Sequence, residues 1–546
     1  MSARPRVEAS DVVFMYAAEP RQYDLYSGTV TGWGGRARAR EGKPLEEFLA
    51  QVQEAKRRGM RYCASVDFLV DFAGFIDFRP NDFMRSVCRD LDDKPLTVPW
   101  LHDHSYKGHP AYWFCSNSPD YRAYLIDQAE RACLAPIDGL HIDDYRGTSA
   151  CAAWNGGCFC EHCMSAFRDY LKRQGKLSAD EAERFDYGRY LRQQGITAER
   201  YRQNPWTVPF GAEFQRFQRE AMMATVKTVF EHAERLRRRP LLRSVNSSAS
   251  SPEALQVEPL VDYFCGEVDH HAATGKLSIE PLFVYRLVEA FGKRQTATAS
   301  GWDWAWIAAQ EKPGMVRAWI AQAYAFGSLF MVPHNQWCYT PERGTHWWRG
   351  KPEDFAPLYR FVRQHRELFD GYLPFTNTLL EIDEPRFGQA KRLAWQLLEA
   401  NVPFALLYRT PDGRVHTAGN VRTSGYRLLA PDRSADNLPD EVRSQLHVES
   451  EGRFVVSLRR HTAQGGYPLV IHLLHRDYRV EGDTVAPADV RLHLGEALLR
   501  RLRATPREVT LFSPDGKART APLQRHREGV MVEVQGAGLW TVLALR

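Results

Sequence analysis

Short apolar runs rich in β-forming residues alternate with longer helical patterns from the start of the chain to about residue 375. Eight such runs with helical segments between them match the strand count of a (β/α)8 barrel, also called a TIM barrel. The expected strands are residues 11–16, 61–68, 95–100, 138–145, 241–248, 261–271, 294–301 and 327–337. We therefore predict an α/β fold whose first and largest part is such a barrel.

Nearly every expected strand ends in polar or reactive side chains, which favours a closed barrel over an open sheet. The carboxyl ends of barrel strands meet at one mouth, where catalytic groups gather. In the alternative interpretation, an open α/β sheet, polar residues simply begin the next loop. The side chains expected at the mouth are Asp67, His102, His104, Asp143, Asp144, Asn246, Glu267, Asp269, His270, Trp302, Asp303, Asn335 and Trp337.

The sequence pattern changes after Gly371. With 546 residues, of which 44% are hydrophobic, the chain is too long for a single core, so we expect further domains. Alternating strand and helix patterns predict a small flavodoxin-like α/β domain, and the last part has the alternation and turns typical of an antiparallel β-sandwich. The predicted domains are 1–373, 374–450 and 451–546.

Charge and apolar runs exclude two classes of partner. The net charge is only +5, with 72 basic and 67 acidic residues mixed along the chain, so no basic stripe predicts nucleic-acid binding. No apolar run is long enough to predict a membrane span. The first 20 residues show no signal-peptide pattern, so we expect a cytoplasmic protein, or a secreted or periplasmic one if a leader has been removed.

Three cysteines, Cys158, Cys160 and Cys163, lie within six residues. Such a cluster favours metal binding, and zinc needs a fourth ligand to complete a tetrahedron. The possible fourth ligands are Cys115, Cys151 and His162. We prefer Cys115 because its loop should lie beside the loop that carries the cluster. The alternative is simple packing of buried cysteines; an all-thiolate Zn²⁺ site would be structural, since it has no open position.

The run GLHIDDY, residues 139–145, contains the first candidate for catalysis. Strand alternation places Asp143 on the inward face and Asp144 on the other, where Asp144 caps a helix or pairs with Arg146. Glycoside hydrolysis needs two carboxyl groups. In the run CGEVDHH, Glu267 shares a face with Asp269, and it is the best partner. The predicted catalytic residues are Asp143 and Glu267, with Asp144 as an alternative.

The remaining mouth residues are candidates for substrate contacts. Aromatic rings suit sugar faces because they combine a flat apolar surface with a polar edge, so Trp302, Trp304 and Trp337 are expected to stack on sugar rings. The predicted substrate-binding residues are Asp67, His102, His104, Asn246, Asp269, Trp302, Asp303, Asn335 and Trp337.

The domain order, together with a cysteine 43 residues before C-x-C-x2-C, resembles the family 42 β-galactosidases. The resemblance implies a zinc site beside the active-site loop and a middle domain that mediates trimerisation. It therefore implies a homotrimer or another homo-oligomer. The zinc ligands implied by the resemblance are Cys115, Cys158, Cys160 and Cys163.

The catalytic pattern differs from that family, which carries an Asn-Glu pair after strand four and a Glu after strand seven. Here the corresponding runs are HIDDYRG and TATASGWDW, and neither contains Glu. The strand-four pattern is similar to that of α-galactosidase-like and α-fucosidase-like retaining barrels. In those barrels an Asp at this place is the nucleophile, and strand six supplies the acid/base in the α-galactosidase-like group. This similarity implies Asp143 as nucleophile and Glu267 as acid/base.

We therefore predict a retaining, exo-acting glycoside hydrolase that removes a terminal sugar from an oligosaccharide or glycoside, with no organic cofactor. One alternative is a non-catalytic carbohydrate-binding barrel, motivated by the missing Glu of strand seven. A second is a β-galactosidase-like hydrolase that uses a different carboxylate pair. A third is a hydrolase or lyase of a non-glycosidic substrate, because fold alone does not fix the reaction.

Overall fold

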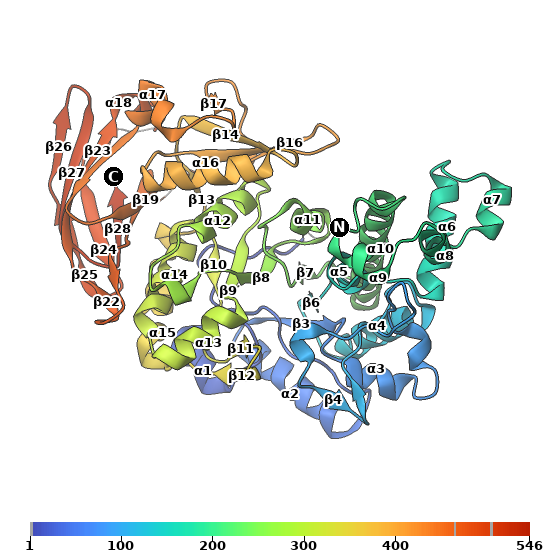
Figure 1. Ribbon diagram of the computed structural model, residues 1–546. Coiled ribbons are helices and arrows are strands. Elements are labelled where there is room, and N and C mark those ends of the chain that lie inside the picture. Colours follow the sequence, from blue (N-terminus) through green and yellow to red (C-terminus); the bar gives the residue numbers. More distant parts are fainter. Residues whose placement is uncertain (1–3, 464–465, 503–505) are drawn as a thin grey trace.

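Eight parallel strands close into a ring in the computed structural model, which describes residues 4–463, 466–502 and 506–546 (Figure 1). Five strands pair in the order β1 (Val13–Phe14), β2 (Val30–Thr31), β3 (Arg61–Asp67), β6 (Gly139–Asp143) and β7 (Leu242–Val245). Three more pair in the order β8 (Phe264–Val268), β9 (Gln295–Ala299) and β10 (Leu329–Phe330). Parallel bridges Asn246–Cys265 and Phe14–Val332 join the two arcs at both ends. The chain therefore forms a (β/α)8 barrel.

Seven of the eight predicted runs contain a barrel strand, and the eighth, residues 95–100, was wrongly assigned. That run forms isolated bridges and the start of the 3₁₀ helix η2 (Pro99–Leu101). Prolines at positions 95 and 99 lack the N–H that a central strand needs. The missing strand is β2, whose two residues are too few for any alternation to show. The strand count of eight was right because these two errors cancel.

Helices cover the outside of the barrel, and each turns an apolar stripe inward. In α2 (Gly42–Arg57), Phe48, Val52 and Ala55 are buried at spacings of three and four residues, as on one helix face. The other helices between strands include α4 (Pro119–Ala132), α10 (Gly211–Arg237), α12 (Glu280–Ala290) and α14 (Pro313–Ala325). Within the described ranges, no helix combines the length and apolar character needed to cross a bilayer.

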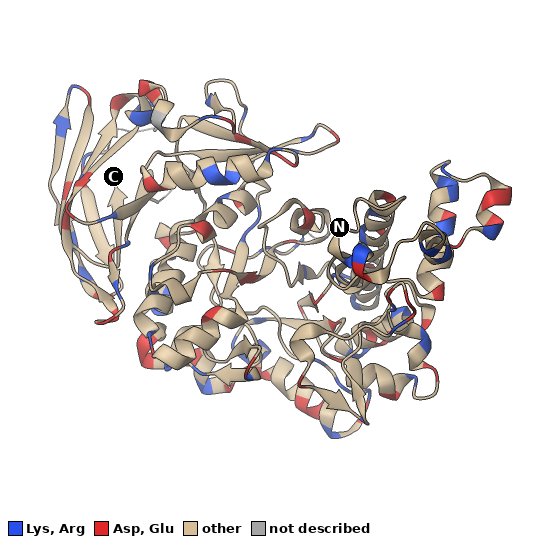
Figure 2. Ribbon diagram, viewed as in Figure 1, with Lys and Arg blue, Asp and Glu red and all other residues tan. Residues whose placement is uncertain are grey.

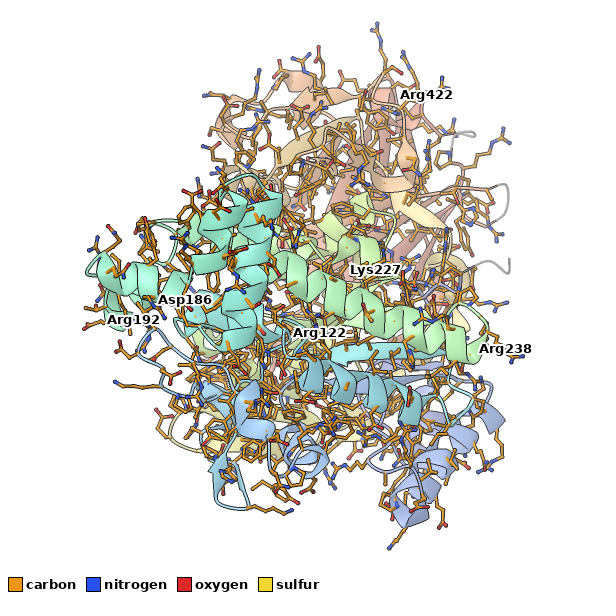
Figure 3. The ribbon with its side chains drawn as sticks, turned by 90° about the vertical axis from the view of Figure 1, so that its right-hand side faces the viewer. Arg122, Asp186, Arg192, Lys227, Arg238 and Arg422 are labelled. Atoms are coloured by element: carbon orange, nitrogen blue, oxygen red, sulfur yellow. The ribbon has the colours of Figure 1, made fainter. Side chains whose placement is uncertain are left out.

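A helical insertion follows β6 before α10 begins. Its helices are α5 (Gly147–Trp154), α6 (Glu161–Arg173), α7 (Ala179–Arg184), α8 (Tyr187–Gln193) and α9 (Ala198–Gln203). Figure 3 shows the part that carries Asp186 and Arg192 projecting beside α10, which carries Lys227. Figure 2 shows basic and acidic residues interspersed over the insertion and the rest of the molecule, in agreement with the mixed charges of the sequence.

Besides the two-stranded sheet of β21 (Tyr478–Arg479) and β22 (Thr484–Val485), three larger sheets form the C-terminal part. In the first, β14 (Thr378–Asp383), β15 (Ala405–Arg409) and β17 (Arg427–Leu429) are parallel, β16 (Val415–Thr417) is antiparallel, and α16 (Phe387–Glu399) packs on β14. The others are antiparallel, with orders β13-β19-β20-β28-β24-β25 and β18-β23-β27-β26. Their bounds are β13 (Tyr372–Pro374), β18 (Leu446–Ser450), β19 (Phe454–His461), β20 (Leu469–His475), β23 (Ala488–Gly495), β24 (Val509–Ser513), β25 (Gly516–Ala521), β26 (Leu523–His526), β27 (Gly529–Ala537) and β28 (Trp540–Leu545).

The two antiparallel sheets share one apolar core. Leu473 from the larger sheet and Leu492 and Val532 from the smaller one belong to the same buried cluster, so the sheets pack face to face. A buried ion pair between Arg459 Nη2 of β19 and Glu289 Oε1 of α12, 2.5 Å long, joins this part to the barrel. Because β13 pairs with β19, the sheet begins at Tyr372; the predicted domain boundaries stay a prediction.

Candidate active site

Two carboxyl groups predicted to be catalytic lie on strands separated by one neighbour. Asp143 ends β6 and Glu267 lies near the end of β8, with β7 between them. Adjacent strands are about 4.8 Å apart, so the two backbones are separated by roughly 10 Å across the ring. The charge of Asp143 contributes to the raised pKa of Glu267, which indicates that the two carboxyl groups lie near each other.

The Asp143 carboxyl is held by two N–H donors. Asn246 Nδ2 and the backbone N–H of Asp144 both donate to Asp143 Oδ1, each at 2.9 Å. Burial and the neighbouring charge of Asp67 raise the pKa of Asp143 to about 7, while the two donors and Arg36 act to lower it. Oδ1 is thus oriented, and Oδ2 is left to meet a substrate.

The Glu267 carboxyl retains its proton to a higher pH than an ordinary glutamate does. Burial raises its pKa to about 8, and the charges of Asp143, Asp269 and Asp303 add to this effect. No described residue forms a hydrogen bond with the Glu267 carboxyl. Burial and clustered negative charge thus raise the pKa of both carboxyls towards neutral pH, as is typical of groups that exchange protons in catalysis.

The structure corrects the predicted place of Asp144. This residue has φ +46°, a left-handed conformation that takes it out of the strand alternation. Its side chain does not cap α5, whose N-cap is Arg146, and no ion pair joins it to Arg146 among the described residues. Burial, then the charges of Asp143, Asp67 and Glu267, raise the pKa of Asp144 well above its usual value. Asp144 therefore faces the same site as the other two carboxyls.

Two of the residues predicted to bind substrate form hydrogen bonds within the protein instead. Asp67 Oδ1 accepts the N–H groups of Leu69 and Val70, and its Oδ2 accepts Arg36 Nη1 at 3.0 Å. Both oxygens of Asp303 likewise accept backbone N–H groups, from residues 270 and 272, at 2.8 and 2.7 Å. In this structure these carboxylates accept hydrogen bonds from loop backbone, and they lie near Asp143 and Glu267.

The predicted histidines lie at different depths. His102 and His104 follow η2 rather than a strand, and His102 contacts Tyr339 with ring centroids 6.1 Å apart. His270 is fully buried and stacks on Trp319 at 4.5 Å, and burial lowers its pKa to about 3. His270 is therefore a neutral core residue, away from solvent.

Of the tryptophans predicted to contact sugar, one lies in the core and two lie at the surface. Trp304 is buried, and its Nε1 donates to Thr298 Oγ1 at 2.9 Å, so the prediction that Trp304 stacks on sugar is wrong. The helix α13 (Gly301–Gln310) turns this side chain inward. Trp302, at the first turn of the same helix, is 55% exposed, and Trp337 is partly exposed. Of the other predicted contacts, Asn335 is partly exposed and Asp269 is exposed.

Tyr16 and Arg36 belong to the site although the sequence did not indicate them. Burial, then the charges of Asp143, Glu267 and Asp67, raise the pKa of Tyr16 well above its usual value, which indicates that Tyr16 lies near these carboxyls. Arg36 reaches Asp67 from the loop after β2. Tyr16 ends the first predicted strand, so its position at a strand end could have indicated it. Arg36 follows β2, the strand that the sequence did not reveal.

Four cysteine sulfurs come together, as the sequence predicted. The Sγ atoms of Cys115, Cys158, Cys160 and Cys163 all lie within 4.8 Å of one another, and all four side chains are buried. The amides of Asn117 and Gln218 donate to Cys163 Sγ, each at 3.3 Å, as expected around a thiolate. Cys151 and His162 are outside this group. This set could hold a metal ion between the loops that follow β3 and β6.

Comparisons with known proteins place this geometry in context. No protein-family model matches the chain. Two curated relatives, alpha-agarases of Thalassotalea agarivorans and Alteromonas agarilytica, are each 22% identical over 100% and 96% of this chain. The chain spans only 40% and 39% of their lengths.

Similar solved structures are glycoside hydrolases. An alpha-L-fucosidase, isoenzyme 2 from Paenibacillus thiaminolyticus, has TM-score 0.61 and 11% identity, covering 99% of this chain and 100% of its own. A catalytic mutant of Gan42B, a GH42 beta-galactosidase from G. stearothermophilus, has TM-score 0.54, 11% identity and the same coverage. The beta-galactosidase of Marinomonas ef1 has TM-score 0.51 and 12% identity, covering 98% and 100%. At these identities the likeness shows the fold.

Proposed function

We propose that the chain is a glycoside hydrolase that cleaves its substrate with retention of configuration, with Asp143 as nucleophile and Glu267 as acid/base. The observation that carries the proposal is a pair of neighbouring carboxyls at the ends of β6 and β8, both with raised pKa values. Two N–H donors orient Asp143, whereas Glu267 has no hydrogen-bond partner among the described residues. The activities named for the curated relatives and for the similar structures support the same class of reaction.

The reaction has two steps. Asp143 Oδ2 attacks the anomeric carbon while Glu267 gives its proton to the departing glycosidic oxygen, which leaves a glycosyl ester on Asp143. The ionised Glu267 then takes a proton from water, the water oxygen attacks the anomeric carbon, and the ester bond breaks. Asp143 returns as carboxylate and Glu267 as acid.

The substrate to test first is agarose, because both curated relatives are named alpha-agarase. Release of reducing sugar from agarose or from α- and β-linked aryl glycosides tests the proposal, and no release from any of them would contradict it. The sequence-based predictions of exo-action, cytoplasmic location and homo-oligomer formation stay predictions.

The rate should depend on pH as a bell. The productive state needs ionised Asp143 and protonated Glu267, so kcat/KM should fall below about pH 7 and above about pH 8. Asn246→Ala removes a donor that favours ionised Asp143, which raises its pKa and moves the acidic limb to higher pH. Gln524→Ala, on the distant strand β26, should move neither limb. An acidic limb that stays in place in Asn246→Ala would contradict the assignment.

We also propose that the four-cysteine group holds structural Zn²⁺. The fit rests on four buried sulfurs within 4.8 Å of one another and on the amide donors beside Cys163. Zinc held by Cys115, Cys158, Cys160 and Cys163 would tie together the loops after β3 and β6, and it would supply no open position for water.

Removing one sulfur should cost both the metal and stability. Cys160→Ser should lose zinc, measured by elemental analysis, and should lower the melting temperature by several degrees, because metal binding contributes directly to folding. Cys133→Ser, outside the cluster, should retain zinc. Wild-type protein purified without zinc that cannot be loaded with it would overturn this proposal.

A further inference from the structure

Three half-exposed tryptophans stand on the face of the barrel that carries the carboxyls. Trp154, Trp302 and Trp347 are 50%, 55% and 51% exposed. Each belongs to a segment that leaves the carboxyl end of a barrel strand, namely β6, β9 and β10. Large exposed aromatic side chains grouped on one face mark a binding surface more often than scattered ones do. The contacts of these tryptophans indicate which kind of ligand the surface would bind.

On one side of the mouth the aromatic residues are linked to one another. Tyr339 of β11 (Gln336–Thr340) stacks on Trp337 at 5.8 Å and meets the edge of Trp302 at 5.8 Å. The Trp337 ring also packs closely against Gly301, where a Cβ would lie 2.4 Å from the ring, so a larger residue would not fit there. The rings are therefore fixed as a group, with Trp302 facing outward.

A second contact joins this side to the reaction centre. Trp347 of β12 (Gly344–Trp348) meets Tyr16 with ring centroids 5.7 Å apart. Tyr16 follows β1 at its carboxyl end and stacks on Trp33 at 6.2 Å, and Trp33 meets His141 of β6, two residues before Asp143, at 4.7 Å. An aromatic surface thus extends from the carboxyls outward over β12.

Trp154, the third of these tryptophans, lies on the other side of the mouth. In the ring order, β6 is the fourth strand after β10, which places it opposite in a barrel of eight. Trp154, which follows β6, contacts Trp100 at 6.0 Å, and Trp100 in turn packs on buried Trp113 at 5.4 Å. The Arg146 guanidinium lies 5.6 Å from the Trp154 ring centroid. This tryptophan is also fixed, next to a hydrogen-bond donor.

We propose that Trp154, Trp302, Trp347 and Tyr339, the aromatic rim, bind a polysaccharide chain across the barrel mouth. Sugar units would lie on both sides of the bond that Asp143 and Glu267 cleave, so cleavage would occur within the chain, in place of the exo-action predicted from the sequence. A site for one terminal sugar needs rings around one subsite only, whereas this rim extends to opposite sides. Flat rings beside polar groups such as Arg146 suit hydroxyl-bearing sugar faces. The inference rests on the proposed function for the position of the cleaved bond.

Binding of agarose oligosaccharides from disaccharide to dodecasaccharide, measured by calorimetry, tests the rim. In the inactive Asp143→Gly protein, which does not consume the ligand, affinity should rise with length. Adding Trp154→Ala or Trp302→Ala to it should weaken binding of the longest oligosaccharide by about three- to tenfold, while hardly changing that of the disaccharide. Trp206→Ala is the matched control. Trp206 is 47% exposed and carries Arg219 at 4.8 Å, but it is outside the rim.

The outcomes separate the two proposals. Affinity that is independent of length, undetectable at every length, or weakened equally by Trp206→Ala would overturn the rim. Products limited to terminal mono- or disaccharides from the first minutes would also overturn it. Length-dependent binding without any hydrolysis would leave the rim in place and would refute the proposed function instead.

Discussion

Replacing Asp143 by glycine should lower kcat/KM for an aryl glycoside by about 10⁴-fold or more, because the carboxylate that attacks the anomeric carbon is lost. Asn246 and the Asp144 N–H, which now orient Oδ1, cannot replace the lost nucleophile. The space left by the carboxymethyl group admits a small anion. Added azide should therefore restore a measurable part of the rate.

The product of that rescue identifies the role of Asp143. Azide that enters from the side of the missing nucleophile reacts once, so the glycosyl azide should have the anomeric configuration opposite to that of the substrate. Asp144→Gly is the matched control, since it removes the adjacent carboxyl of the same cluster. Full activity in Asp143→Gly, or azide rescue of Asp144→Gly in its place, would transfer the nucleophile to another residue.

Replacing Glu267 by alanine should produce the second large effect, and this effect should depend on the leaving group. For agarose or an alkyl glycoside, whose departing oxygen needs a proton, kcat/KM should fall by about 10²- to 10⁴-fold. For a dinitrophenyl glycoside the first step needs no acid, so the loss in kcat/KM should be small. The glycosyl ester then accumulates, because no base activates water, and a burst of dinitrophenol should precede a slow steady state.

Azide also distinguishes this variant from the first. It should attack the accumulated ester, so its product should keep the configuration of the substrate. Glu280→Ala, a carboxyl outside the mouth cluster at the start of α12, should behave as wild type. An equal loss for good and poor leaving groups in Glu267→Ala would show that Glu267 is not the acid.

The sequence assigned Asp143 and Glu267 to the fourth and sixth barrel strands, where the structure has them, because strand-end signals are local. The apolar runs before Asp143 and Glu267 are long enough to be recognised, and side chains at strand ends are brought together by the barrel itself. The cysteine group was recognised for a similar reason: three of its members lie within six residues, and only Cys115 required a preference between alternatives.

The features that escaped the sequence depend on contacts between distant segments. Arg36 follows a two-residue strand with no periodic signal. Trp347 could not be recognised from the sequence, because its contact with Tyr16 forms only when the β11–β12 hairpin folds. Asp144 left the expected face through its left-handed backbone. Trp304 was expected to meet sugar, but helix α13 begins at Gly301 and turns it into the core. Periodicity cannot predict where such short elements begin.

The most direct measurement of the central claim is the identification of the covalent intermediate. Wild-type protein inactivated with a fluorinated glycosyl fluoride should gain one sugar per chain, and tandem mass spectrometry of the peptide that contains residues 139–146 should place that sugar on Asp143. A sugar located on Asp144 or Glu267, or hydrolysis with inversion and no trapped sugar, would contradict the account.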